Sequence, residues 1–161
     1  MSQEMMQAEQ EKVKELKLQA RYHNRMHMEM EAISQNEGLA RVAVAAFMSH
    51  MDPTIEEVND VKTAVSEAVT NSIIHGYRNQ GGKIGITCVR DQDILIVTIM
   101  DRGVGIDNIH QAMEPMFTTG GDMERSGMGF SFLEAFMDDV KVESIVGMGT
   151  RVQMRKRIAH E

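Results

Sequence analysis

VKTAVSEAVTNSIIHGY, residues 61–77, carries two interlocking patterns. We predict that it forms the second half of a helix that begins near Thr54, in which each residue advances about 100° around the axis. An apolar stripe for a buried core then comprises Val58, Val61, Val65, Val69 and Ile73. Glu67, Asn71 and His75 share the four-residue spacing on another side of the helix. Such a line is usually a solvated face, but glycine-rich sequences farther along the chain favour the wall of a cleft.

Composition and charge limit the classes of function. The 161 residues suit one domain, with 42% hydrophobic and 25% charged residues. A formal net charge of −7 and 4% aromatic residues argue against direct nucleic-acid binding. The lone cysteine, Cys88, lies in an apolar run and is expected to be a small buried hydrophobe. With a polar N-terminus and no apolar run of membrane length, the sequence predicts a cytoplasmic protein that binds no membrane.

The chain is predicted to have two parts. Residues 1–23 are rich in Gln, Glu and Lys but lack an apolar stripe, so we expect a flexible N-terminal extension, frayed or disordered. A partner-binding helix is the alternative for this segment. Residues 24–158 carry the alternating and periodic apolar patterns and form the folded domain.

Within the domain, the elements follow from these patterns and from turn residues. In order we predict a strand (27–33), a helix (34–51), the long helix (from 54), two strands (83–90 and 94–100), a short helix (108–113), a lid (114–129), a helix (130–136) and two strands (140–146 and 150–156). Ser34 and Glu37 have the form of a capping box for the first helix. Asp52 is expected to cap the second, with Pro53 at its first position. The order predicts an α+β two-layer sandwich with helices on one face of a mixed, mostly antiparallel sheet.

Four short motifs converge in the predicted domain: Glu67-x3-Asn71-x3-His75, Asp101-x-Gly103-x-Gly105, Gly127-x-Gly129 and Gly147-x-Gly149-Thr150. The amide oxygen of Asn71 suits Mg²⁺, which prefers oxygen ligands and keeps phosphates and water in its shell. Glu67 could accept a proton from an attacking hydroxyl. Ionised Asp101 only accepts hydrogen bonds, so it fits the exocyclic amine of adenine and rejects the carbonyl of guanine.

The glycines of these motifs favour close approach of a ligand. Gly103 and Gly105 would let the backbone approach a purine. Gly127 and Gly129 precede a helix, whose free amides and positive dipole end can bind phosphate. Thr150 could add a hydroxyl near the adenine. His75, at the end of its line, is more simply a structural histidine or a polar wall residue than a catalytic group.

Together the motifs resemble the ATP-binding (Bergerat, or GHKL) fold of type II topoisomerases, heat-shock chaperones, mismatch-repair ATPases and histidine kinases. Longer runs resemble one family more closely, the sporulation anti-sigma-F factors of endospore-forming bacteria. These runs are ISQNEGLARVAVAAF, SEAVTNSIIHGY, MFTT, ERSGMGFSFLEAFMD and VESIVGMGT. The resemblance covers about residues 24–156, nearly the whole domain.

The resemblance implies an ATP-dependent protein serine kinase that binds ATP or ADP with Mg²⁺, dimerises, and holds a sigma factor of the F type. It also implies phosphorylation of the anti-anti-sigma antagonist on a serine. By position, Glu67 would be the catalytic base, Asn71 the magnesium ligand, and Asp101 with Gly105 the adenine contacts. The residues at the phosphates would be Thr119, Ser126, Gly127, Met128, Gly129 and Phe130. Arg41, on the exposed side of the domain's first helix, matches a position of partner contact.

The sequence departs from this family at one informative place. Gly120 stands where the family usually has a lysine after MFTT. A lysine near the γ-phosphate would help to neutralise charge during transfer, so we expect slower phosphoryl transfer here. Two alternatives stay open: a general-stress anti-sigma kinase with the same chemistry, and a nucleotide-dependent sequestering module without kinase activity. The intact Glu67 argues against the second.

Overall fold

The protein folds around one antiparallel sheet. The computed structural model describes residues 2–20, 24–107, 113 and 129–158. The five strands pair in the order β1-β2-β3-β5-β4, and every neighbouring pair is antiparallel. Their bounds are β1 Asn24–Glu31, β2 Lys83–Asp91, β3 Ile94–Asp101, β4 Asp139–Ile145 and β5 Gly149–Arg157. The two predicted hairpins are therefore present, and the sheet, expected to be mixed, is antiparallel throughout.

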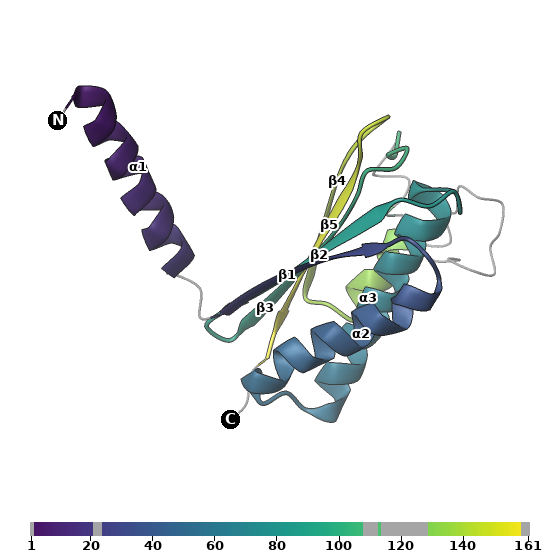
Figure 1. The fold of residues 1–161 in the computed structure, drawn as a ribbon. Coiled ribbons are helices and arrows are strands. Elements are labelled where there is room, and N and C mark those ends of the chain that lie inside the picture. The colour runs from purple at the N-terminus through teal and green to yellow at the C-terminus, as the bar shows by residue number, and fades with distance from the viewer. Residues whose placement is uncertain (1, 21–23, 108–112, 114–128, 159–161) are drawn as a thin grey trace.

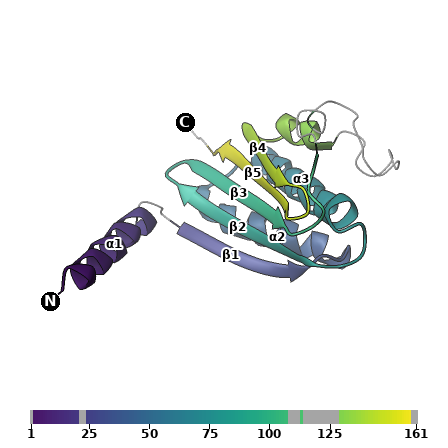
Figure 2. The ribbon, with the colours of Figure 1, turned by 90° about the horizontal axis from the view of Figure 1, so that it is seen from above.

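Helices cover one face of this sheet. Figures 1 and 2 show α2 and α3 side by side on the same face, which confirms the two-layer α+β architecture. The helical elements are α1 Gln3–Ala20, α2 Gln35–Met48, a 3₁₀ turn Ser49–Met51, α3 Ile55–Asn71, a π-helical turn Ser72–Gly76 and a 3₁₀ helix Gly129–Ala135. The predicted long helix thus ends in a wider π turn, and the helix predicted over 130–136 is a 3₁₀ helix.

The apolar stripe predicted for the long helix forms the centre of the core. Val61, Val65 and Val69 are buried completely, and Ile73 is buried as well. Val58 packs against the same core from its edge. The strands contribute alternate residues, because successive side chains of a strand point to opposite faces. These strand residues include Ile84, Ile86, Cys88, Leu95, Val97 and Ile99. Cys88 is thus a buried hydrophobe, as predicted, and its burial raises the pKa of the thiol to about 12.

The helix caps differ from those expected. The N-cap of α3 is Thr54, whose hydroxyl accepts the Glu57 N–H while the Glu57 carboxylate accepts the Thr54 N–H. Asp52, predicted to be this cap, instead ends the preceding 3₁₀ turn with φ 52° and ψ 52°. Ser34 occupies the N-cap of α2 but has helical φ and ψ angles, and its side chain makes no capping hydrogen bond. A capping side chain needs extended backbone angles to reach the first free amides, which Thr54 has and Ser34 lacks.

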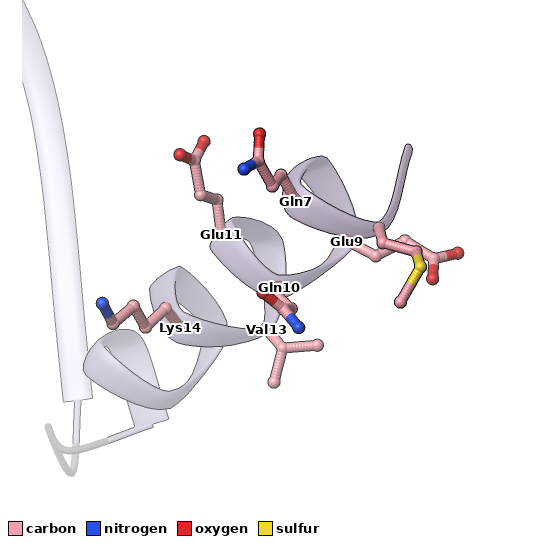
Figure 3. A pocket seen from close by; sticks show the side chains of 7 residues that line it. Gln7, Glu9, Gln10, Glu11, Val13 and Lys14 are labelled. Carbon is pink, nitrogen blue, oxygen red and sulfur yellow. The ribbon is translucent and has the colours of Figure 1, made fainter. Parts of the chain in front are cut away.

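Helix α1 lies apart from the domain in both ribbon views (Figures 1 and 2). Its side chains are exposed from Gln3 to Lys14, the part for which side chains are described. A hollow along this helix is lined by seven of its own residues, among them Val13 and Lys14, and is open helix surface (Figure 3). This segment is helical where we expected a frayed or disordered extension. Its flexibility, and the division from residue 24 onward, stay predictions.

The two N-caps provide a direct test of this geometry. Thr54→Ala removes a hydrogen-bonded capping box and should lower the free energy of unfolding by about 1 kcal/mol. Ser34→Ala, at an exposed N-cap without a capping bond, should change it by less than about 0.5 kcal/mol. Urea unfolding followed by circular dichroism measures both. Equal losses from the two substitutions would contradict the assignment of Thr54 as the cap.

Candidate functional site

Asn71 is the most unusual polar residue of the core. It is the last residue of α3 and is 5% exposed. Among the described residues, neither its amide oxygen nor its amide nitrogen has a hydrogen-bond partner. A buried polar group without a partner costs about 1–3 kcal/mol, so native proteins keep few of them without a use. Asn71 is therefore a candidate for contact with a ligand.

Glu67 lies one helical turn before Asn71. Its side chain is half-buried, and this burial raises the pKa of the carboxyl from 4.5 to about 6. A carboxyl group with a pKa near 6 is still ionised at neutral pH but is a stronger base than an exposed glutamate. His75, the third member of the line, lies in the π turn and is partly buried. Its place on one line with Glu67 and Asn71 stays a prediction.

Asp101 ends β3 on the face covered by the helices. Its carboxylate is buried and accepts the Gly103 N–H at 2.9 Å. Burial raises the pKa of Asp101, while hydrogen bonds from the Gly103 backbone, the Ser72 hydroxyl and the Thr150 backbone act in the opposite direction. Donors from three segments thus fix the carboxylate: Ser72 of the π turn, Gly103 of the loop after β3, and Thr150 of β5. Sequence reasoning missed Ser72, whose only signal is its place beside Asn71.

Glycines let the π turn approach the end of β3. A Cβ on Gly76 would lie 2.9 Å from the Asp101 carboxyl carbon, and a Cβ on Gly103 would lie 2.1 Å from the Gly76 carbonyl oxygen. A Cβ on Gly105 would likewise lie 2.4 Å from the Ile145 carbonyl oxygen. Protein backbone thus already requires the absence of side chains at Gly103 and Gly105. Their predicted contact with a purine stays a prediction.

Thr150 lies opposite Asp101 in the pairing of β3 with β5. It is buried, and its hydroxyl lies 2.9 Å from the Ser144 hydroxyl, which also accepts the Ile106 N–H at 2.8 Å. The end of β3, the start of β5 and the π turn therefore meet around the buried carboxylate of Asp101. This arrangement brings Asp101 and Gly103 of the second motif together with Gly149 and Thr150 of the fourth, beside the π turn that follows Asn71. The Gly147 N–H joins it by donating to the Val104 carbonyl at 2.8 Å.

The third motif lies largely outside the described residues. These positions are Thr119, Ser126, Gly127 and Met128, with Gly120 and most of the predicted short helix and lid. Gly129 begins the 3₁₀ helix that follows. Phe130, predicted at the phosphates, is partly buried and packs against the hydrophobic core. Arg41 lies on the exposed side of α2, as predicted, with its Nε 3.5 Å from a Glu37 carboxylate oxygen.

Comparison with known proteins places this geometry in a family. A family model described as the histidine kinase-like ATPase domain matches residues 30–156. The anti-sigma F factor of Clostridium acetobutylicum is 54% identical over 136 residues, which is 84% of this chain and 95% of the relative. That of Geobacillus thermodenitrificans is 53% identical over 84% of this chain and 94% of the relative. The chain belongs to the anti-sigma F factor family of histidine kinase-like ATPase domains.

Solved structures agree with this fold. The RsbU and RsbW domains of a Mycobacterium tuberculosis protein match 84% of this chain and 32% of that chain, with a TM-score of 0.61 and 17% identity. The catalytic domain of the histidine kinase ThkA matches 83% of this chain and 96% of that chain, with a TM-score of 0.53 and 16% identity. At such identities the likeness concerns the fold alone.

The residues of this anti-sigma F family member fit a nucleotide with Mg²⁺. The unpartnered Asn71 amide offers a neutral oxygen of the kind that Mg²⁺ accepts. No three His, Cys, Asp or Glu side chains converge on a metal-sized site within the described part of the chain. A magnesium ion at Asn71 would therefore take most of its ligands from phosphate and water.

No helix among the described residues is long and apolar enough to cross a membrane.

The stability of the nucleotide-free protein should report the unpartnered amide. Asn71→Leu replaces it with an apolar side chain of similar size and should raise the free energy of unfolding by about 1 kcal/mol or more. Asn59→Leu, at an exposed position of the same helix, controls for the gain in helix propensity. Urea unfolding without nucleotide compares the two. A gain at residue 71 no larger than that at residue 59 would show that the Asn71 amide is satisfied in the free protein.

Proposed function

We propose that the protein is an ATP-dependent anti-sigma factor and protein serine kinase. In this proposal it holds a sporulation sigma factor of the F type and phosphorylates its anti-anti-sigma antagonist on a serine. The observation that carries it is the unpartnered Asn71 amide, one turn from a glutamate of raised pKa and near the end of β3 that holds a buried aspartate. Membership of the anti-sigma F family supports the choice of partners.

The nucleotide would lie across the end of the sheet. Asp101 would accept a hydrogen bond from the adenine amine, next to Thr150, and Asn71 would hold Mg²⁺. The glycine-rich residues 126–130 would cover the phosphates with backbone amides. Bound nucleotide with Mg²⁺ supplies the phosphoryl group and neutralises part of its charge. The chain's own residues then have to orient the acceptor serine and remove its proton.

Glu67 is the group best suited to receive this proton. As the serine oxygen forms its bond to the γ-phosphorus, the bond to the oxygen of the β-phosphate breaks and ADP leaves. The hydroxyl proton passes to the Glu67 carboxylate. A pKa of about 6 makes this carboxylate basic enough to help while it remains mostly ionised at pH 7.

The partner surface would lie on α2, away from the sheet. Arg41 is exposed there, and Leu39 and Val42 beside it are 51% and 62% exposed. An arginine among exposed apolar side chains has the composition of an interface anchor. We propose that sigma factor and antagonist compete for this surface on a homodimer in the cytoplasm, where RNA polymerase acts.

A sequestering module without kinase activity is the second candidate. Gly120 in place of the family's usual lysine favours it, because a cationic side chain near the γ-phosphate stabilises the charge of transfer. The two candidates share nucleotide and sigma binding and differ only in phosphoryl transfer.

Transfer of labelled γ-phosphate from ATP to the anti-anti-sigma protein distinguishes these candidates. We expect the wild type to transfer phosphate and Glu67→Gln to lose at least about 100-fold in rate while it still binds ATP. Because protonated Glu67 cannot accept a proton, kcat/KM of the wild type should fall as the pH drops below about 6. Glu56→Gln, at an exposed position of the same helix, is the matched control. No transfer by wild type together with nucleotide-dependent sigma capture would leave the sequestering module.

The partner surface is tested by charge reversal. Arg41→Glu should weaken sigma binding by at least about 10-fold, as expected for an interface arginine, and leave ATP affinity unchanged. Arg155→Glu reverses a charge that is also exposed, on β5, and should leave both affinities unchanged. Calorimetric titration measures the two. Sigma binding by Arg41→Glu at wild-type affinity would remove α2 from the proposed interface.

A further inference from the structure

The hydroxyl of Tyr77 lies where the ladder between β2 and β3 stops. The last pair of that ladder is Ile84 with Asp101, so Lys83 and Arg102 would form the next pair in register. The Tyr77 oxygen accepts the Arg102 N–H at 2.7 Å and donates to the Lys83 carbonyl at 2.5 Å. It thus stands between a donor and an acceptor that would bond directly if the ladder continued. The phenol oxygen replaces one backbone hydrogen bond with two.

This insertion sets where the chain leaves the sheet. Beyond Arg102, the Gly103 N–H turns back to the Asp101 carboxylate, and the Val104 N–H donates to the Gly76 carbonyl at 2.9 Å. Gly76 is the last residue of the π turn, and Tyr77 follows it directly. Two neighbouring residues therefore act together. The Tyr77 hydroxyl ends the ladder, and the Gly76 carbonyl accepts a hydrogen bond from the loop that leaves the sheet.

Gly82 leaves room for the aromatic ring of Tyr77. A Cβ on Gly82 would lie 2.4 Å from a ring carbon of Tyr77, so only glycine leaves room for the ring there. The Gly82 carbonyl accepts the Ala32 N–H at 2.8 Å, which ties this support to the end of β1. Because the ring is held on one side and the hydroxyl is bonded on two, its oxygen has a fixed position at the end of the sheet.

We infer that the Tyr77 hydroxyl is a positioning group for the purine site: by holding Arg102 away from Lys83, it sets the turn in which Asp101 and Gly103 face the nucleotide base. The inference rests on the proposed binding of ATP and goes beyond it, since it assigns a role to a residue whose hydroxyl bonds to the backbone of Lys83 and Arg102. Without the hydroxyl, the Arg102 N–H either loses its partner or bonds directly to Lys83. Both outcomes move the turn that carries the base-reading carboxylate, so discrimination between adenine and guanine should suffer more than phosphate binding.

Tyr77→Phe tests the inference, because it keeps the ring over Gly82 and removes only the oxygen. We expect its Kd for ATP to rise about tenfold, and its preference for ATP over GTP to fall by a similar factor, because the two hydrogen bonds that position the turn are lost. The kcat for transfer at saturating ATP should stay within about twofold, because Glu67 and Asn71 lie on α3. Amide exchange at Gly103 should quicken in the nucleotide-free protein, because either outcome at Arg102 moves the turn that carries Gly103.

Two controls separate positioning from general stability. Tyr22→Phe removes the same oxygen from the chain's other tyrosine, which lies outside the matched family residues 30–156, and should change nothing. Val44→Ala lowers stability from the fully buried face of α2 and should leave the preference for ATP over GTP as in wild type. A Tyr77→Phe protein with lowered stability but wild-type Kd values for both nucleotides would overturn the inference. If wild type binds no ATP, the proposed function fails first and the inference falls with it.

Discussion

The close approach of the π turn to the end of β3 is the contact on which the site depends. The Gly76 carbonyl accepts the Val104 N–H, and no side chain could fit at Gly76 without meeting the Asp101 carboxylate. A regular α-helix would carry residues 72–76 past this point with a narrower turn. The π turn widens the helix end by one residue per hydrogen bond, which lets Ser72 and Gly76 both reach Asp101. Such turns often mark functional sites because they give up regular packing for a particular side-chain placement.

The site also gathers free-energy costs that the core has to offset. Asn71 is buried without a partner, and Glu67 and Asp101 are carboxyl groups whose pKa values are raised by burial. Each is unfavourable for folding, and in the proposed complex a cation and hydrogen-bond donors would offset these costs. The fully buried valines on the opposite side of α3 supply the compensating apolar burial. One helix thus carries the stabilising stripe and the destabilising site on different faces.

The sequence was sufficient for the parts of the molecule governed by periodicity. The stripe of α3, the hairpin of β2 with β3 and the two-layer architecture follow from which residues need burial, and all are present. The sequence was not sufficient for the helix caps, where the backbone angles of one residue decide whether its side chain can cap the helix. Asp52-Pro53 and Ser34 both have the composition of caps, but Asp52 takes a left-handed angle and Ser34 a helical one. Composition cannot reveal that difference, since it depends on how the chain reaches the next helix.

The polar residues of the candidate site fall into two groups, those with a signal in the sequence and those without one. Asn71, Asp101 and Thr150 could be singled out from the sequence because they stand in short motifs, and all three are buried polar residues, while their contacts with a nucleotide stay predictions. Ser72 and Tyr77 could not, since Ser72 bonds to Asp101 and Tyr77 to Arg102, which is 25 residues farther along the chain. Hydrogen bonds of that kind exist only once the sheet and the helix have packed together.

The packing also connects the site to the segment that follows the glycine-rich stretch. The Lys156 ammonium donates to the Phe136 carbonyl at 2.8 Å and lies 3.5 Å from an Asp60 carboxylate oxygen, with its side chain 12% exposed. It thereby ties the end of the 3₁₀ helix 129–135 to both α3 and β5. A largely buried ion pair of this kind resists separation, because breaking it would leave a charge without a partner. The chain beyond the glycine-rich residues is therefore anchored to the same helix that carries Glu67 and Asn71.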